Sequence, residues 1–235
     1  MNLHKLILTN NACFNASRTI KPMGIMVHST GTNNPFLYRY VGPDDGKLGV
    51  NLSGNHWNQY KPGGKQVCVH AFIGRLSDGT IATYQTLPWN YRAWHCGSGK
   101  KGSGNDTHIS FEICEDNLTN EAYFHKVFKE AVELCVYLCK VYGLTEENII
   151  CHSEGYKLGI ASNHADVMHW FPKFGENMDS FRAAVKTGLK AEVAKAEDGK
   201  KLYRVLIGAY ASKDNADAMV KKLKLAGFEG FVKFE

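Results

Sequence analysis

The sequence lacks a long apolar segment. No stretch of the 235 residues approaches the ~20 consecutive apolar residues that a membrane-spanning helix needs. The N-terminal segment MNLHKLILTNN contains an apolar run of only three residues, so it does not have the extended hydrophobic region of a secretory signal peptide. We therefore expect a protein that is made in the cytoplasm without a signal peptide and does not insert into a membrane.

The sequence also lacks the cysteine spacing of a disulfide or metal framework. It has seven cysteines, an odd number, and no two of them form a CxxC motif. Several lie in apolar runs such as VCVHAF and ELCVYLC. This pattern favours buried, reduced thiols over disulfides.

Charge of one sign is not abundant either. The net charge is +5, and 44% hydrophobic with 22% charged residues is typical of a soluble globular protein. The small positive excess is compatible with an anionic cell surface, but a solvated basic surface explains it more simply. We expect no nucleic-acid partner.

The apolar pattern predicts several strands and one hairpin. A short buried strand is expected at Gly24–His28, another in THISFEICE (residues 107–115) and a third in NIICH (residues 148–152). A hairpin is expected with arms Val67–Leu76 and Thr80–Leu87, joined at Asp78-Gly79. In the second of these strands, alternate apolar residues at 109, 111 and 113 should share one face.

A long amphipathic helix is predicted between residues 119 and 144. Apolar residues recur there at steps of three or four: Phe124, Phe128, Ala131, Cys135, Leu138 and Val141. Thr119 or Asn120 can cap its start, and Gly143 can end it. The segment SFRAAVKTGLKAEV, nearer the C-terminus, is also expected to be helical.

The C-terminal part of the chain differs in composition. KAEVAKAEDGKK is charged and poor in large apolar residues, which indicates a linker. Beyond it, the pattern predicts strand, helix and strand within about 35 residues. The expected division is therefore a main domain at 1–188, a linker at 189–201 and a small β-α-β unit at 202–235. Such a short unit buries little surface alone, so it should pack on the main domain or pair with a second copy.

Histidines end two of the predicted strands. His28 follows one strand and His152 follows another, and their rings converge if these strands are neighbours. A third ligand for a metal would come from the loop NHADVMHW. Three protein ligands and one open position are typical of catalytic zinc, although a single histidine at a strand end is more often an ordinary polar residue.

The motifs GIMVHST, VHAFIGRLSDGTIATYQTLPWNYRAWHCG, DTHISFEICED and ICHSEGYKLGIASNHADVMHW occur in this order. Together they resemble the zinc-dependent N-acetylmuramoyl-L-alanine amidases of the type-2 family, which includes peptidoglycan recognition proteins and many phage endolysins. The resemblance covers residues 20–185. It implies an α/β fold with a central mixed β-sheet flanked by helices.

The resemblance also implies roles for individual residues. The zinc ligands would be His28, His152 and Asp166, because no cysteine after Cys151 is available for the Cys variant of the third ligand. An alternative has His164 as the third ligand and Asp166 behind it. If Asp166 is the third ligand, the resemblance implies that His164 stabilises the transition state.

Glu112 would be the general base. Some relatives use a tyrosine just before the hairpin histidine instead, but Val69 stands there in this chain. Trp94, His95 and Trp170 would contact substrate, although each is compatible with a packing role. His70 is expected in the core or behind the ligands, and His169 is not expected to be a ligand.

The tail YRVLIGAYASKDNADAMVKKLKLAGFEGFVKFE resembles half of a sporulation-related repeat (SPOR), a domain that binds peptidoglycan. The resemblance implies wall binding or dimerisation by this unit. The whole chain would then hydrolyse peptidoglycan as an endolysin, released by a holin, or as an autolysin. The alternative is a non-catalytic muropeptide-binding protein.

Overall fold

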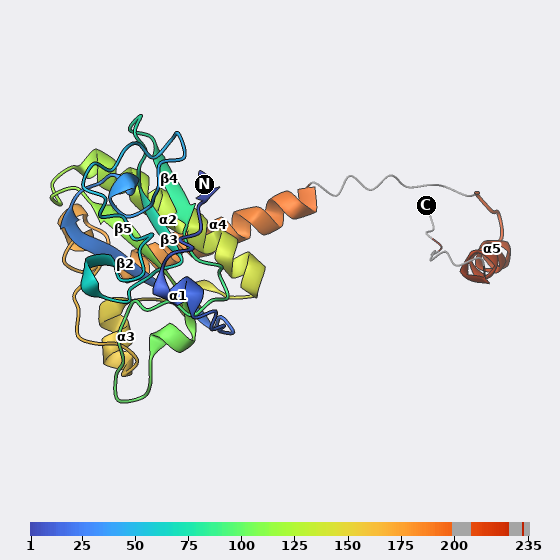
Figure 1. The fold of residues 1–235 in the computed structure, drawn as a ribbon. Coiled ribbons are helices and arrows are strands. Elements are labelled where there is room, and N and C mark those ends of the chain that lie inside the picture. Colours follow the sequence, from blue (N-terminus) through green and yellow to red (C-terminus); the bar gives the residue numbers. More distant parts are fainter. Residues whose placement is uncertain (199–207, 226–231, 233–235) are drawn as a thin grey trace. The chain divides into compact units, whose positions relative to one another are not determined.

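A computed structural model of the chain describes residues 1–198, 208–225 and 232. It divides into two units, Met1–Val193 and Ala194–Glu235, which are described separately. The first unit holds a six-stranded sheet in the order β1-β4-β3-β5-β2-β6 (Figure 1). The strands are β1 Leu3–Lys5, β2 Gly24–Asn33, β3 Ala71–Arg75, β4 Ile81–Gln85, β5 His108–Glu115 and β6 Ile149–Cys151.

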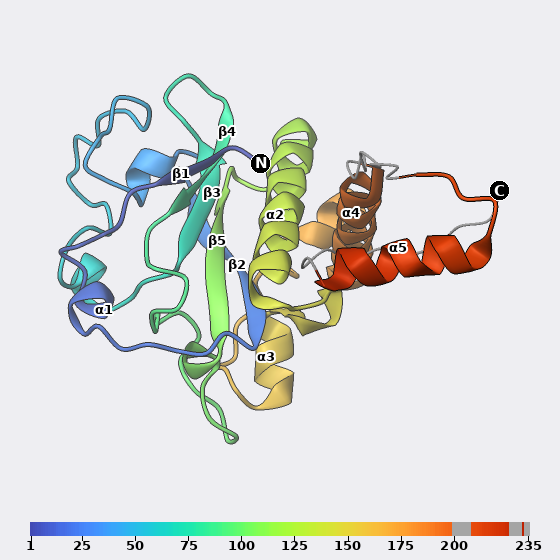
Figure 2. The same ribbon diagram turned by 90° about the vertical axis from the view of Figure 1, so that its right-hand side faces the viewer.

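Helices flank the sheet, and one of them, α2, lies along one of its faces (Figure 2). The α-helices are α1 Ala12–Asn15, α2 Glu121–Tyr142, α3 His152–Leu158, α4 Met178–Asp198 and α5 Lys213–Leu225. Five 3-10 turns join them: η1 Leu37–Arg39, η2 Pro62–Gly64, η3 Gly104–Asp106, η4 Glu146–Asn148 and η5 Phe171–Phe174. Strands β3 and β4 are antiparallel and the other pairs are parallel, so the predicted mixed sheet is confirmed.

The predicted hairpin is formed by β3 and β4. Asp78 and Gly79 make its turn: the Asp78 carboxylate accepts a hydrogen bond from Thr80 N at 2.9 Å, and Gly79 has φ +83°. A positive φ is readily adopted by glycine because it has no Cβ. The paired arms, Ala71–Arg75 and Ile81–Gln85, are shorter than the predicted arms. The segment before Ala71 is not part of this strand ladder.

Helix α2 has the predicted caps. The Asn120 side chain accepts a hydrogen bond from Tyr123 N, and Gly143 ends the helix in a left-handed conformation with φ +66°. Most of the predicted apolar stripe is buried against the sheet, but Val141, near the C-terminal end, is 50% exposed. The stripe therefore ends one turn earlier than its spacing predicts.

The two faces of the sheet carry different residues. Ile25, Val27, Ile109, Phe111 and Ile113 are fully buried in one cluster with α2, as expected for alternate positions of β2 and β5. Burial of each such side chain contributes roughly 1.5–3 kcal/mol. The intervening residues of both strands point to the opposite face, where the candidate site lies.

The prediction of buried thiols is confirmed, because all seven cysteines are buried and free. Strand β1 was not predicted. It pairs with β4 at the sheet edge over only three residues. No helix within the described residues is long and apolar enough to cross a membrane.

Helix α4 extends to Asp198 and so includes most of the segment predicted as a linker. In the second unit, α5 matches the predicted helix, and none of its described residues is buried. The two strands predicted on either side of α5 lie almost entirely outside the described residues. The domain boundaries stay a prediction.

Candidate metal centre

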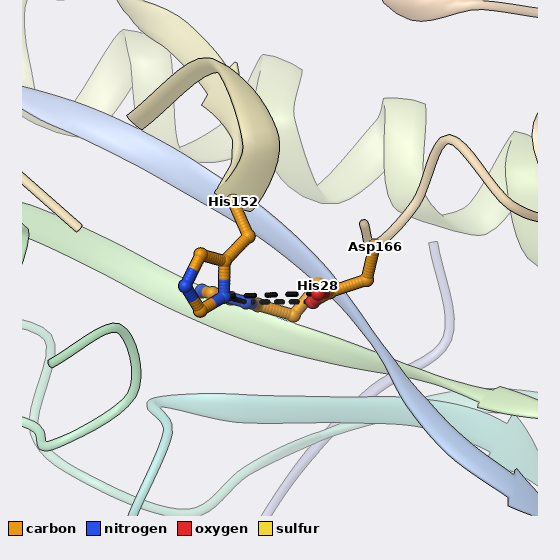
Figure 3. A group of neighbouring side chains, drawn as sticks. All are labelled: His28, His152 and Asp166. Atoms are coloured by element: carbon orange, nitrogen blue, oxygen red, sulfur yellow. Dashed lines mark hydrogen bonds and ion pairs between the residues drawn. The ribbon is translucent and has the colours of Figure 1, made fainter. Parts of the chain in front are cut away.

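Three side chains from distant parts of the sequence, His28, His152 and Asp166, meet in one cluster (Figure 3). His28 alternates along β2 with Val27, which packs against α2, so its side chain points to the other face of the sheet. His28 lies on β2, which continues beyond it to Asn33, whereas a strand ending at His28 was predicted. His152 is the first residue of α3, directly after β6. Because β2 and β6 are parallel neighbours, with Val27 opposite Cys151, the two histidines converge as predicted.

The third side chain, Asp166, comes from the loop between α3 and η5. The ligand atoms of His28, His152 and Asp166 all lie within 4.8 Å of one another, and the three residues are buried. His28 Nδ1 lies 3.2 Å from His152 Nδ1 and 2.9 Å from Asp166 Oδ2. His152 Nδ1 lies 3.7 Å from Asp166 Oδ1.

This arrangement fits a zinc ion. Zinc with bonds of ~2.0–2.1 Å to nitrogen and oxygen in tetrahedral geometry separates its ligand atoms by roughly 3.3 Å. The distances from His28 Nδ1 to His152 Nδ1 and to Asp166 Oδ2, 3.2 and 2.9 Å, are close to that value, and His152 Nδ1 lies 3.7 Å from the other carboxylate oxygen, Oδ1. Two imidazoles and one carboxylate are also a donor set typical of catalytic zinc, leaving one position open.

The electrostatics of the ligands favour the states that bind metal. Burial and the neighbouring His28 lower the pKa of His152 from 6.5 to about 4, so its ring is neutral near pH 7. Burial opposes the ionisation of Asp166, but the hydrogen bond with His28 and the nearby His152 hold its pKa well below the usual range. A neutral imidazole and an ionised carboxylate are the forms that ligate metal.

Glu112 lies beside this cluster. It is opposite His28 in the β2–β5 ladder, so both side chains point to the same face. Its Oε2 atom is buried and has no hydrogen-bond partner. Burial, together with the charges of Asp166 and Glu115, raises the pKa of Glu112 well above its usual range. A carboxyl group left without a protein partner in such a place is available to a substrate, a water molecule or a proton.

His164 lies at the open side of the cluster. Its side chain is 60% exposed, and its Nδ1 contacts Asp166 Oδ1. The ring centroid lies 5.3 Å from that of His152. Of the two residues considered for the third ligand, Asp166 is the one grouped with both buried histidines.

The two tryptophans predicted to contact substrate differ in their exposure to solvent. Trp94 is 44% exposed, with the Arg92 guanidinium 5.2 Å from its ring centroid, so it can meet a ligand. The prediction for Trp170 is wrong. Its side chain is fully buried against Phe124 and Phe171 in the core, where no substrate reaches it.

His95 is partly exposed and contacts the proposed metal ligand His28. Its Nδ1 lies 2.9 Å from His28 Nε2, while its own Nε2 is buried without a partner. Burial and the nearby His28 hold the pKa of His95 well below the usual range, so the ring is neutral.

The other two histidines considered have structural partners. His70 is fully buried; its Nε2 donates to Tyr91 O at 2.8 Å and its Nδ1 accepts from Ser110 N at 3.0 Å. It therefore belongs to the core. His169 contacts Glu115 at 2.9 Å, which ties the Asp166 loop to β5.

Two residues of the site were not predicted. Asn105 is fully buried and bonds the backbone of the turn that carries His95. The Ser162 hydroxyl lies 3.3 Å from His152 Nε2 and 3.2 Å from Cys96 O. Single polar residues in Gly/Ser-rich loops give no sequence signal of such contacts.

Comparison with known proteins identifies the family of the chain. The family model described as N-acetylmuramoyl-L-alanine amidase matches residues 18–169, well over half of the chain. The chain belongs to this family of amidases. A second model, of the SPOR domain, matches residues 176–233, a longer range than the predicted tail, because it includes α4.

Solved structures support the same fold. The catalytic domain of XlyA has a TM-score of 0.54 at 22% identity, covering 79% of this chain and 99% of that one. PlyL has a TM-score of 0.53 at 22% identity, covering 79% and 96%. The Staphylococcus aureus hydrolase AmiA, in complex with its ligand, has a TM-score of 0.56 at 19% identity, covering 83% and 86%. No curated protein matches the chain significantly.

Proposed function

We propose that this chain is a zinc-dependent amidase that hydrolyses the bond between the lactyl group of N-acetylmuramic acid and L-alanine in peptidoglycan. The observation that carries the proposal is the convergence of His28, His152 and Asp166 beside the unpartnered carboxyl oxygen of Glu112. The family membership supplies the reaction class.

His28, His152 and Asp166 would hold the zinc ion. When bound there, zinc supplies a Lewis acid that polarises the amide carbonyl and lowers the pKa of a water molecule to ~7. The protein residues have the remaining tasks of positioning the substrate and moving protons.

Glu112 is the proposed general base. Two observations support this role: its buried Oε2 has no protein partner to compete for a proton, and it is paired with the proposed ligand His28 across the β2–β5 ladder. It would accept a proton from the attacking water and deliver it to the leaving amine of L-alanine.

His164 is the proposed oxyanion stabiliser. Its contact with Asp166 orients the ring, while its exposed side can donate a hydrogen bond to the developing negative charge on the carbonyl oxygen. Trp94, which is 44% exposed, would offer an apolar face to the sugar or peptide.

The biological setting is part of the proposal. A wall-acting amidase with a SPOR domain fits an endolysin released by a holin or an autolysin that leaves the cell by another route. We propose residues 1–188 as the catalytic domain and 202–235 as a unit that binds wall or pairs with a second copy. A non-catalytic muropeptide-binding protein would not need Glu112 in the position observed.

The test is digestion of purified cell walls, with mass spectrometry of the products and zinc analysis of the protein. We expect one zinc ion per chain and new N-terminal L-alanine on released peptides. Cleavage between sugars or inside the stem peptide would contradict the proposal, as would full activity after complete metal removal.

A further inference from the structure

The second nitrogen of His28 has a specific partner. A histidine that ligates a metal through Nδ1 must carry its proton on Nε2, because a neutral imidazole has one proton. His28 Nδ1 faces His152 and Asp166, so its Nε2 points away from the cluster, and there it lies 2.9 Å from His95 Nδ1.

We propose that His95 is a positioning residue that fixes the tautomer and the ring orientation of His28 for metal binding. This inference rests on the proposed function only in that His28 is taken as a metal ligand. In the metal-bound protein, His28 Nε2–H donates to His95 Nδ1, so His95 carries its own proton on Nε2. The Nε2 atom of His95 is buried without a partner in the described structure, so no other protein group sets its tautomer.

The turn that carries His95 is held rigidly. Asn105 Oδ1 accepts hydrogen bonds from His95 N at 2.8 Å and from Cys96 N at 3.2 Å, and Asn105 Nδ2 donates to Gly97 O at 2.9 Å. Asn105 is fully buried. One side chain therefore anchors three successive residues, and the His95 ring approaches His28 from a fixed backbone.

In this proposal, His95 of the segment AWHCG orients a metal ligand and does not line a substrate groove. Partners of ligating histidines fix their tautomer and raise their basicity, and removing such a partner typically costs about 10- to 100-fold in metal affinity. His95 acts on the reaction through His28, without contacting substrate.

Zinc affinity of three variants tests this. In His95→Leu the acceptor is lost, and we expect zinc affinity to fall about 10- to 100-fold. Asn can place its amide oxygen where the His Nδ1 stood, so His95→Asn should recover most of that loss. The matched control is His108→Leu, since half-buried His108 bonds Thr107 and no metal ligand; its zinc affinity should equal that of the unaltered chain.

A spectroscopic measurement needs no variant and so does not depend on the folding of His95→Leu. Ring nitrogen NMR of the zinc-loaded full chain should show both His28 and His95 protonated at Nε2. His95 protonated at Nδ1, or equal zinc affinity in His95→Leu and the unaltered chain, would overturn the inference and leave the proposed function standing. A chain that binds no zinc would overturn both.

Discussion

Glu112 and His28 occupy paired positions on neighbouring parallel strands. The β2–β5 register places them opposite each other, one strand spacing apart, with their side chains on the same face. Because strands in a sheet are ~4.7–4.9 Å apart, this register alone brings a carboxyl group beside the proposed metal ligand. The buried neighbours Val27, Phe111 and Ile113 hold that register, since a slip of one residue would turn them out of the core.

Replacement of Glu112 should therefore separate metal binding from catalysis. In Glu112→Gln, shape and burial are kept but the proton acceptor is lost, so we expect wall lysis to fall by about 10²–10⁴-fold. Zinc content should be unchanged. The measurement is the rate of turbidity loss of purified walls beside metal analysis; unchanged lysis would remove Glu112 from the mechanism.

The third ligand can be assigned by a pair of substitutions. Asp166 forms one cluster with the two buried histidines. His164 is 60% exposed, and Asp166 is the one proposed ligand with which it forms a hydrogen bond or ion pair. We expect Asp166→Ala to lose zinc. We expect His164→Ala to keep zinc and to lose about 10²–10³-fold in rate, the usual effect of removing one oxyanion donor. The reverse pattern of zinc loss would make His164 the ligand.

The two tryptophans predicted to contact substrate should respond in opposite ways to substitution. Trp170 is fully buried, so Trp170→Ala should lower the free energy of unfolding by about 3–5 kcal/mol. Trp94 is 44% exposed, so Trp94→Ala should weaken wall binding and leave the unfolding free energy nearly unchanged. Denaturant unfolding and wall sedimentation measure the two effects; a large stability loss in Trp94→Ala would assign that ring to the core.

Buried His70 should make stability depend on pH. Burial lowers its pKa from 6.5 to about 4, so between these values the unfolded chain binds a proton that the folded chain does not. Acid therefore favours unfolding: the stability is fully present above 6.5 and is lost as the pH falls toward 4. One such group contributes about 1.4 kcal/mol per pH unit within this range.

The measurement is urea unfolding at pH 7.5, 6 and 5 with a chelator present, so that metal release does not contribute. His70→Gln should have a shallower pH dependence than the unaltered chain. The exposed His125 on α2 gives the control, since His125→Gln removes no buried imidazole. Equal slopes in all three proteins would show that His70 is protonated in the folded state near pH 6.

Local elements were predicted well because their signals are local. The caps of α2, Asn120 and Gly143, act on backbone groups within one turn, and the Asp78-Gly79 turn is decided by its own two residues. Strand β1 was missed for the opposite reason. It is three residues long and exists through pairing with β4, some eighty positions away in the sequence.

The burial of single aromatic and polar side chains was less predictable from the sequence. Trp170 stands in a segment rich in polar residues, and an indole ring is equally suited to stacking on a sugar and to packing in a core. Its burial follows from where η5 meets α2. His95 and Asn105 likewise gave no local sign of their partners.

The sequence by itself determined the strands other than β1, the long helix and the set of residue types that can bind a metal, because alternation, caps and side-chain chemistry are properties of short segments. Only the tertiary structure decided which of these residues meet. The pairing of β2 with β5 and β6 brings His28, Glu112 and His152 onto one face, and the fold of the loop after α3 adds Asp166. The contacts of His28 with His152 and Asp166 depend on the packing of segments more than a hundred residues apart, which no local pattern records.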